Sequence, residues 1–149
     1  ASSPYDEEGV ATAERPIVRG GVLEGYFLGS YSARKLGMPS TGSAGGNPNL
    51  VVRTEPVDLR GMLKRLQRGL LVTEILGHGV NLVTGEYSHG PAGYWVEGGE
   101  IAFPVEEITV AGNLRDMFRG IVGVGSGVVG RGSRKTGSIL IESMTIAGN

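Results

Sequence analysis

LVTEILGHGVNLVTGEYSHGPAGYWVEGGEIAFPVEEITVAG, residues 71–112, alternates runs of strand-forming residues with glycine-rich turns. Within it, residues 94–97 and 100–103 flank Gly98 and Gly99. Glycine tolerates the positive φ angles that a two-residue turn needs, so this part predicts a β-hairpin. Pro104 either ends that ladder or places it at a sheet edge. Further strands are expected at residues 71–76, 80–83 and 108–110.

Two amphipathic helices flank this β-rich stretch. Asp58 can cap the first, and Asn113 can cap the second, with Asp116 in its first turn. Apolar residues recur at helical spacing in both segments, and we expect both stripes to pack in the core. The first stripe is Leu59, Met62, Leu63, Leu66 and Leu70, with Gly69 near its end, and the second is Leu114, Met117, Phe118, Ile121 and Val122.

The remaining segments add short elements to the same pattern. Residues 17–28 predict a hairpin with a glycine turn, and residues 30–36 a short helix or an irregular turn. Residues 39–48 predict a flexible loop, whereas residues 49–54 and 138–141 predict strands. The predicted fold class is therefore α+β, with a mainly antiparallel β-sheet or barrel-like domain and about two helices packed against it.

Composition limits the classes of function. The chain has 149 residues, of which 40% are hydrophobic and 19% charged, as in an ordinary globular domain. A net charge of −1 offers no broad positive field to a nucleic acid. The absence of cysteine excludes disulfides, thiol nucleophiles and thiolate metal ligands. No apolar run reaches the roughly 20 residues that span a bilayer, and the first residues lack a signal-peptide pattern.

Two glycine-rich motifs suggest nucleotide binding at first sight. Residues 125–130, GSGVVG, match the dinucleotide pattern G-x-G-x-x-G. That pattern needs a strand before it and a helix after it, but here it follows the second predicted helix, so we expect a connector. The sequence GSRKT at residues 132–136 has no glycine before Lys135, which excludes a phosphate loop.

Catalytic and metal sites find little support in the residues. His78 and His89 are the only histidines, whereas a zinc site usually needs three or four converging ligands. Ser88 is next to His89, but neighbouring side chains on a strand point to opposite faces and cannot form a nucleophile–base pair. We therefore expect no catalytic residue, no metal ligand and no cofactor in this chain.

The best binding candidates are Tyr87, Ser88, Gly90 and Tyr94. They belong to residues 85–95, GEYSHGPAGYW, which place aromatic side chains around a predicted glycine-rich turn. Aromatic groups beside free backbone edges can hold an extended peptide by strand addition. The alternative is an ordinary hairpin whose aromatic residues pack in the core.

Three stretches of the chain together resemble a known family. They are SYSARKLG at residues 30–37 with STG at 40–42; VN at 80–81 with TGEYS at 84–88; and PVEEITVAGNL at 104–114 with the ending MTIAGN at 144–149. On these residues the chain resembles the C-terminal region of PmbA/TldD proteins, most of all their PmbA (TldE) branch. These are cytoplasmic, two-subunit proteins related to metallopeptidases and historically called modulators of DNA gyrase. The resemblance implies that residues 16–149 form that C-terminal domain, and that residues 1–15 are a polar lead-in at the cut edge of a longer protein.

The resemblance also implies where the chemistry of the family lies. In that family a TldD-type subunit carries zinc on an H-E-x-x-x-H helix with a C-terminal cysteine, and the pair degrades or trims unfolded peptides. This chain has neither the motif nor a cysteine, so no metal ligand can be carried over to it. We expect zinc in the partner subunit, a TldD-like subunit or a second copy as partner, and extended peptides as substrates.

Three functions remain open on this basis. The leading hypothesis is a scaffold or peptide-binding part of a two-subunit peptide-processing complex. The second is part of an active zinc metalloprotease whose H-E-x-x-x-H lies in a missing N-terminal portion. The third is a nucleic-acid-associated regulator, which the balanced charge disfavours.

Overall fold

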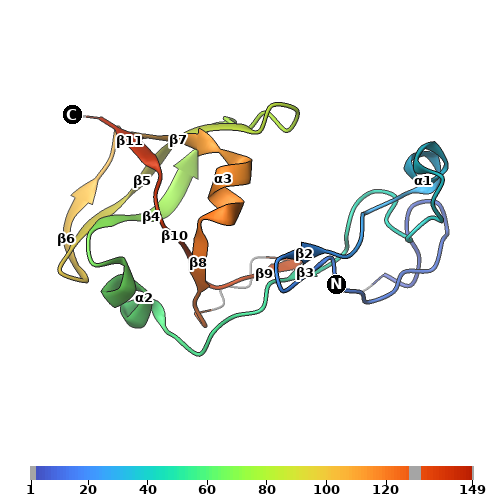
Figure 1. Ribbon diagram of the computed structural model, residues 1–149, viewed down its shortest axis with the longest axis horizontal. Helices are drawn as coiled ribbons and strands as arrows, with labels where there is room; N and C mark the ends of the chain where they lie inside the picture. The colour runs from blue at the N-terminus through green and yellow to red at the C-terminus, as the bar shows by residue number, and fades with distance from the viewer. Residues whose placement is uncertain (1–2, 128–131, 149) are drawn as a thin grey trace. The chain divides into compact units, whose positions relative to one another are not determined.

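The computed structural model describes residues 3–127 and 132–148. They belong to two compact units, the first from residues 1–51 and 130–135 and the second from residues 52–129 and 136–149. The first unit contains β1 (Val18–Arg19), β2 (Val22–Leu23), α1 (Ser30–Leu36), β3 (Leu50–Val51) and β9 (Arg134–Lys135) (Figure 1). The second contains α2 (Leu59–Leu66), β4 (Gly69–Leu76), β5 (Glu86–Glu97), β6 (Glu100–Val105), β7 (Thr109–Asn113), α3 (Leu114–Arg119), β8 (Ile121–Val124), β10 (Ile139–Ile141) and β11 (Thr145–Ala147).

The predicted elements of the first unit are present, but they are short. β1 and β2 pair antiparallel across Gly20 and Gly21, both of which have positive φ angles. Residues 30–36 form a helix, the first of the two expected alternatives, and Gly37 ends it in the left-handed conformation. The strand expected at residues 49–54 is reduced to the two residues of β3, which pair in parallel with β9.

The loop expected at residues 39–48 is held in place by polar side chains. The hydroxyl of Thr41 accepts a hydrogen bond from the Leu28 amide at 2.8 Å. On the other side of the loop, the Asp6 carboxylate accepts one from the Ala44 amide at 3.0 Å. These bonds satisfy backbone groups that a loop otherwise leaves to water, so side chains rather than a ladder fix its path.

A five-stranded antiparallel sheet organises the second unit, with β5 at its centre. Residues 86–89 of β5 pair with β7, residues 90–96 with β4, and residues 93–97 with β6. β7 also pairs with β11, whereas β8 and β10 form a separate pair. The predicted α+β class with a mainly antiparallel sheet is confirmed. Within the described residues the strands do not close into a barrel, and a third helix adds to the two expected.

The turn predicted around residues 85–95 is wrong, because these residues belong almost entirely to β5. Residues 90–92 pair with β4 alone, so Pro91 meets no second ladder in which its missing N–H would be needed. Gly93 allows a close approach between strands: a Cβ there would lie 1.9 Å from the carbonyl oxygen of Leu71. Glycine and proline are therefore accommodated within a closely packed central strand here, and they do not form a turn.

The reversal lies earlier, at residues 80–83, where a strand was expected. Val80 makes one isolated bridge to Tyr87, and the following residues form a turn. The Asn81 side-chain oxygen accepts hydrogen bonds from the amides of Val83 at 3.0 Å and Thr84 at 3.2 Å. An asparagine that satisfies the amides two and three residues ahead competes with strand formation, which explains the error.

The first predicted helix is shorter than its apolar stripe. Asp58 caps α2 as expected, and its carboxylate accepts a hydrogen bond from the Gly61 amide at 2.8 Å. The helix ends at Leu66, because Gln67 has a φ of 58° that a helix cannot continue. Leu70 was assigned to the helix by its spacing, but it lies in β4.

The second predicted helix is also shorter than expected. Asn113 caps α3 as expected, with its side chain accepting from the Arg115 amide at 3.0 Å. The helix ends at Arg119, and Ile121 and Val122 begin β8 instead of extending the apolar stripe. Phe118 is 70% exposed, so the prediction that this stripe packs as a core face is wrong.

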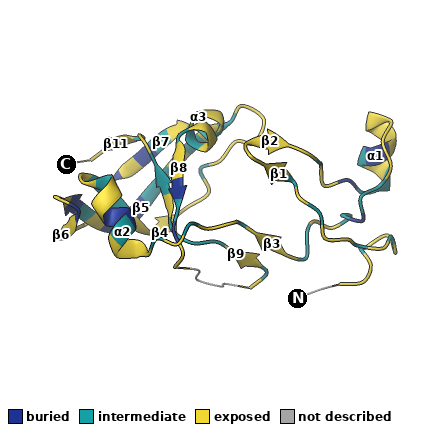
Figure 2. Ribbon diagram, turned by 60° about the horizontal axis from the view of Figure 1, so that its bottom comes forward, coloured by how far each residue is buried: buried dark blue, intermediate teal, exposed yellow. Residues whose placement is uncertain are grey.

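The core of the second unit gathers around α2 and the β5–β6 hairpin (Figure 2). Val96 is completely buried, and Met62 and Leu63 are the buried residues of α2. The predicted two-residue turn is confirmed at Gly98 and Gly99, both with positive φ. A Cβ on Gly99 would lie only 3.0 Å from the Cα of Lys64, so this glycine lets the helix approach the hairpin closely.

Candidate functional site

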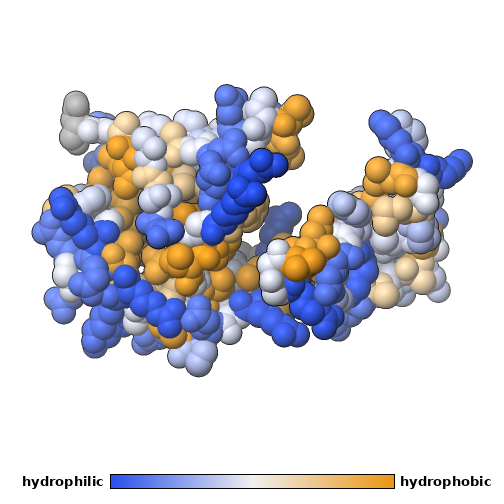
Figure 3. Space-filling view, viewed as in Figure 1, coloured by the Kyte–Doolittle hydropathy of each residue, from blue (hydrophilic) through white to orange (hydrophobic). Residues whose placement is uncertain are grey.

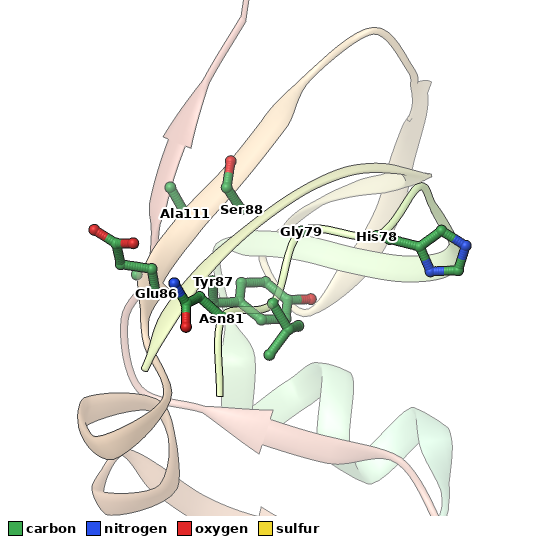
Figure 4. Close-up of a pocket in the computed structure, with 9 residues that line it drawn as sticks. His78, Gly79, Asn81, Glu86, Tyr87, Ser88 and Ala111 are labelled. Atoms are coloured by element: carbon green, nitrogen blue, oxygen red, sulfur yellow. The ribbon is translucent and has the colours of Figure 1, made fainter. Parts of the chain in front are cut away.

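A groove of about 490 Å³ opens beside the first residues of β5. Its lining comes from residues 78–81 after β4, residues 86–88 of β5 and residues 111–112 of β7. Figure 4 shows the side chains of Tyr87 and Asn81 in the middle of these residues, with Glu86 and His78 at opposite ends. The groove therefore follows the line along which the turn, β5 and β7 meet.

Glycines bring the turn against β5. Gly77 has a φ of 85° and redirects the chain after β4. Gly79 accepts a hydrogen bond from the Ser88 amide at 2.7 Å. A Cβ on Gly79 would overlap the Ser88 carbonyl oxygen, at 1.4 Å, so the turn can lie this close only with glycine. The wall of the groove is thus set by backbone contact.

Tyr87 is the aromatic side chain of the groove. It is half-buried, and burial raises the pKa of its hydroxyl above the ordinary value. The phenol therefore stays protonated at neutral pH and can donate a hydrogen bond. Its ring centroid lies 4.7 Å from that of His89, whose Nδ1 is 3.3 Å from the Leu76 carbonyl oxygen. An aromatic platform with one neutral donor suits the apolar and amide groups of a peptide.

The four candidate peptide-binding residues are divided by the structure. Tyr87 and Ser88 line the groove, whereas Gly90 and Tyr94 lie further along β5 and do not. Gly90 pairs with Leu76 of β4, and the exposed Tyr94 pairs with Leu71. The structure therefore brings together the first two candidates and separates them from the other two.

Most of the other groove residues were not candidates for binding, although Asn81, Ala111 and Gly112 lie in stretches that carry the family resemblance. Asn81 shapes the turn, and its position before a Thr-Gly pair is the signal that could have identified it. Ala111 and Gly112 reach the groove because β7 pairs with the start of β5. That pairing joins residues more than twenty positions apart, so no local sequence pattern predicts it.

The strand that precedes the groove lining in the chain, β4, is an edge strand of the sheet. Among the described residues β4 pairs with β5 and with no other strand, and the groove lining begins two residues after β4 ends. Ile75 and Leu76 at this end of β4 are more than half exposed. Unpaired strand edges with exposed apolar residues accept extended chains by β-addition.

The turn also carries an apolar tip beyond the groove. Leu82 is 85% exposed and Val83 is 95% exposed. Figure 3 shows this hydrophobic tip on the loop between β4 and β5. The hydrogen bonds of Asn81 fix the turn that contains these two residues, so the turn keeps both apolar side chains exposed to solvent.

The residues considered for catalysis remain scattered within the part of the chain that the structure describes. No group of three or more His, Asp or Glu residues lies together as metal ligands would. Ser88 and His89 are neighbours within β5, where side chains alternate between faces. No helix among the described residues is long and apolar enough to cross a membrane.

The dinucleotide-like motif is only partly described. Gly125 follows β8, a strand, where we expected a helix to precede it. A Cβ on Gly125 would lie 2.9 Å from the Met62 side chain and from the Val57 carbonyl oxygen, so this glycine has a packing role. Residues 128–130 of the motif lie outside the described residues.

Comparisons of the sequence and of the fold with known proteins point to the same family. The family model of the PmbA/TldA metallopeptidase C-terminal domain matches residues 1–148. Metalloprotease PmbA of Escherichia coli O157:H7 is 51% identical over 148 residues, which are 99% of this chain and 33% of that protein. The metalloprotease PmbA homolog of Haemophilus influenzae is 49% identical over 150 residues, with 100% of this chain and 33% of that protein covered. The chain therefore spans about a third of the length of these relatives.

Solved structures show the same fold. A proposed modulator of DNA gyrase from Thermotoga maritima matches with a TM-score of 0.90 and 39% identity, over 98% of this chain and 36% of that one. TldE from Thermococcus kodakarensis matches with a TM-score of 0.83 over 98% of this chain and 36% of that one, and its 22% identity is evidence for the fold alone. With sequence and fold in agreement over its length, the chain belongs to the PmbA/TldD family, of which it is the C-terminal domain.

Proposed function

We propose that this domain holds an extended peptide within a two-subunit peptide-processing complex and contributes no metal ligand of its own. The observation that carries the proposal is the groove beside Tyr87, which opens where the free edge of β4 ends. A peptide added to β4 would continue toward residues 78–81 and meet the Tyr87 ring. The metalloprotease names of the relatives supply the peptide as ligand class.

The physical basis is the pairing of backbone and aromatic contacts. Strand addition supplies hydrogen bonds that are independent of sequence, which suits a protein that handles unfolded chains. The Tyr87 ring adds apolar contact at one position along the peptide. Together they hold a peptide in extended form, which is the form that a peptidase site accepts.

The proposed partner is a TldD-like subunit, with a second copy of this chain as the alternative. One relative, at 27% identity, is a zinc metalloprotease TldD homolog from Saccharolobus solfataricus. The proposal places zinc and the cleavage step in that kind of subunit, and peptide holding in this one.

The test is peptide binding by the full-length protein, alone and with a TldD-type subunit. Fluorescence anisotropy with labelled, unstructured peptides measures affinity, and hydrogen exchange locates the contact. We expect peptide to slow amide exchange in residues 69–88, with residues 18–23 as an internal reference. Absence of binding in both preparations, or protection confined to other segments, overturns the proposal.

A second candidate is that the full-length protein is itself a zinc metalloprotease and that this domain completes its site. The names of the relatives favour this reading, because they describe metalloproteases without reference to a partner. Metal analysis and peptide cleavage, with and without a TldD-type subunit, distinguish the two. A full-length protein free of zinc and inactive alone rules out the second candidate.

A third candidate, a regulator associated with nucleic acid, rests on the gyrase-modulator description of the Thermotoga maritima structure. The net charge of −1 argues against it. Strong, salt-dependent DNA binding by the full-length protein would support it.

A further inference from the structure

One end of the groove lining is acidic. Glu86 is the only carboxylate of the lining, no lysine or arginine lines the groove, and its histidine, His78, lies at the opposite end (Figure 4). The Glu86 carboxylate accepts a hydrogen bond from the Thr84 hydroxyl at 3.0 Å. The two ion pairs among the described residues are Arg19–Glu24 and Arg65–Glu55, so Glu86 is not neutralised by a basic neighbour.

A second hollow, on the other side of β7, also has a negatively charged lining. It measures about 270 Å³ and shares Ala111 and Gly112 with the groove. Its only charged side chain is Asp116, and it too contains no lysine or arginine. A cation at the Glu86 end of the groove therefore meets attraction from Glu86 and weaker attraction from beyond β7, with no lysine or arginine in either lining.

The acidic and the aromatic side chain of the groove lie at different places along it. Tyr87 follows Glu86 in β5, so their side chains point to opposite faces of the strand, and Figure 4 shows Glu86 at one end and the Tyr87 ring in the middle. A basic side chain that reaches the Glu86 end is attracted by the carboxylate, whereas an acidic side chain is repelled and a neutral one gains no charge attraction. The Tyr87 ring adds an apolar contact for a neighbouring part of the same peptide.

Resting on the proposed function, we propose that the groove selects extended peptides that carry a lysine or arginine, with Glu86 as the residue that binds the positive charge. Exposed ion pairs are weak, so the preference for a basic over a neutral side chain is about two- to fivefold in affinity. Because the pair is exposed, the preference shrinks as salt rises from about 50 to 300 mM.

The experiment compares three labelled peptides of Gly, Ser and Ala that differ at one central position, which is Lys, Gln or Glu. Anisotropy gives their affinities for the full-length protein and for Glu86→Gln, Glu86→Lys and Glu106→Gln. Glu106 is an exposed carboxylate outside both linings, so its variant controls for the loss of one negative charge. We expect Glu86→Gln to abolish the preference for the Lys peptide without weakening the Gln peptide. Glu86→Lys should reverse the preference, and Glu106→Gln should keep it.

The outcomes separate this inference from the function on which it rests. Equal binding of all three peptides, or a preference for Lys that survives in Glu86→Gln, overturns the assignment to Glu86 while peptide holding stands. Binding of none of the peptides overturns both. A reversal in Glu86→Lys cannot arise from misfolding, so it supports the assignment even if Glu86→Gln is less stable.

Discussion

Tyr87 and His89 lie on one face of β5 with their ring centroids 4.7 Å apart and their planes inclined by 58°. His89 lies in turn against the Leu76 carbonyl at the end of β4. The ring that lines the groove is therefore supported by a second ring in contact with the neighbouring strand. A rigid aromatic surface loses little entropy when a ligand covers it, which favours binding.

Tyr87→Ala is expected to weaken peptide binding about five- to tenfold, because it removes an aromatic contact worth about 1 kcal/mol. Tyr87→Phe keeps the ring and should stay within about twofold of the wild type. Tyr94→Ala is the matched control, since Tyr94 lies on the same strand outside the groove. Anisotropy with the full-length protein gives all three affinities. If Tyr94→Ala costs as much as Tyr87→Ala, the binding surface is not this groove.

Gly93→Ala is expected to destabilise the protein by at least about 2 kcal/mol, because the new methyl group would meet the Leu71 carbonyl oxygen at 1.9 Å and force the strands apart. Gly90→Ala on the same strand is the control. Its nearest neighbour would be the Ile108 carbonyl oxygen at 3.6 Å, an ordinary contact, and its effect should stay within about 0.5 kcal/mol. Thermal unfolding of the two variants checks the difference. Equal melting temperatures would show that β4 can move away from β5 at no cost.

Local chemistry explains which elements the sequence could predict. The Gly98–Gly99 hairpin, the Asp58 cap and the Asn113 cap each depend on residues within a few positions of one another, and each is present. Tyr87 and Ser88 were chosen from an aromatic and polar cluster around a turn that is absent; both line the groove, and their role in peptide binding stays a prediction.

Tertiary context explains the errors. The glycines and proline of β5 indicated a turn, because nothing local reveals that Gly93 lies against Leu71 in a neighbouring strand. Leu70 fits the helical spacing, but Gln67 turns the chain into β4 before it. The Ala111 side of the groove depends on a long-range pairing that only the assembled sheet provides.

Asp6→Asn is expected to lower the melting temperature at pH 7 and to have little effect at low pH. Burial tends to raise the pKa of the Asp6 carboxyl, but hydrogen bonds from the amides of Ala44, Val10 and Glu8 outweigh it and lower the pKa below its ordinary 3.8. A carboxyl with a lowered folded pKa stabilises the fold above its unfolded pKa and loses that contribution as pH falls through the folded pKa. The gap between wild type and variant should therefore close as pH falls below 3.8.

Melting curves from pH 7 to pH 2.5 test this expectation. Glu14→Gln, at an exposed carboxylate of the same unit, controls for the change of net charge. A difference between wild type and Asp6→Asn that stays constant over the whole range contradicts a role for the ionised carboxylate. It would leave only the loss of an acceptor, which does not titrate.

Asn113 joins the start of α3 to the turn at the groove, and two substitutions separate its contacts. Its oxygen caps the helix through the Arg115 amide at 3.0 Å, and its amide group donates to the Thr84 carbonyl at 3.2 Å. Asn113→Ala removes both contacts and should cost about 1–2 kcal/mol. Asn113→Asp keeps the cap and loses the donor, so it should cost less.

Hydrogen exchange tells these contacts apart. Residues 81–85 should exchange faster in both variants, because the bond to Thr84 is lost in each, whereas α3 should exchange faster only in Asn113→Ala. Peptide affinity should fall in both variants, since the turn carries Asn81 of the groove lining. If Asn113→Asp leaves exchange at residues 81–85 unchanged, the backbone bond from Leu114 to Gly85, at 2.7 Å, is sufficient to hold the turn. In that case the capping oxygen is all that Asn113 contributes to the site.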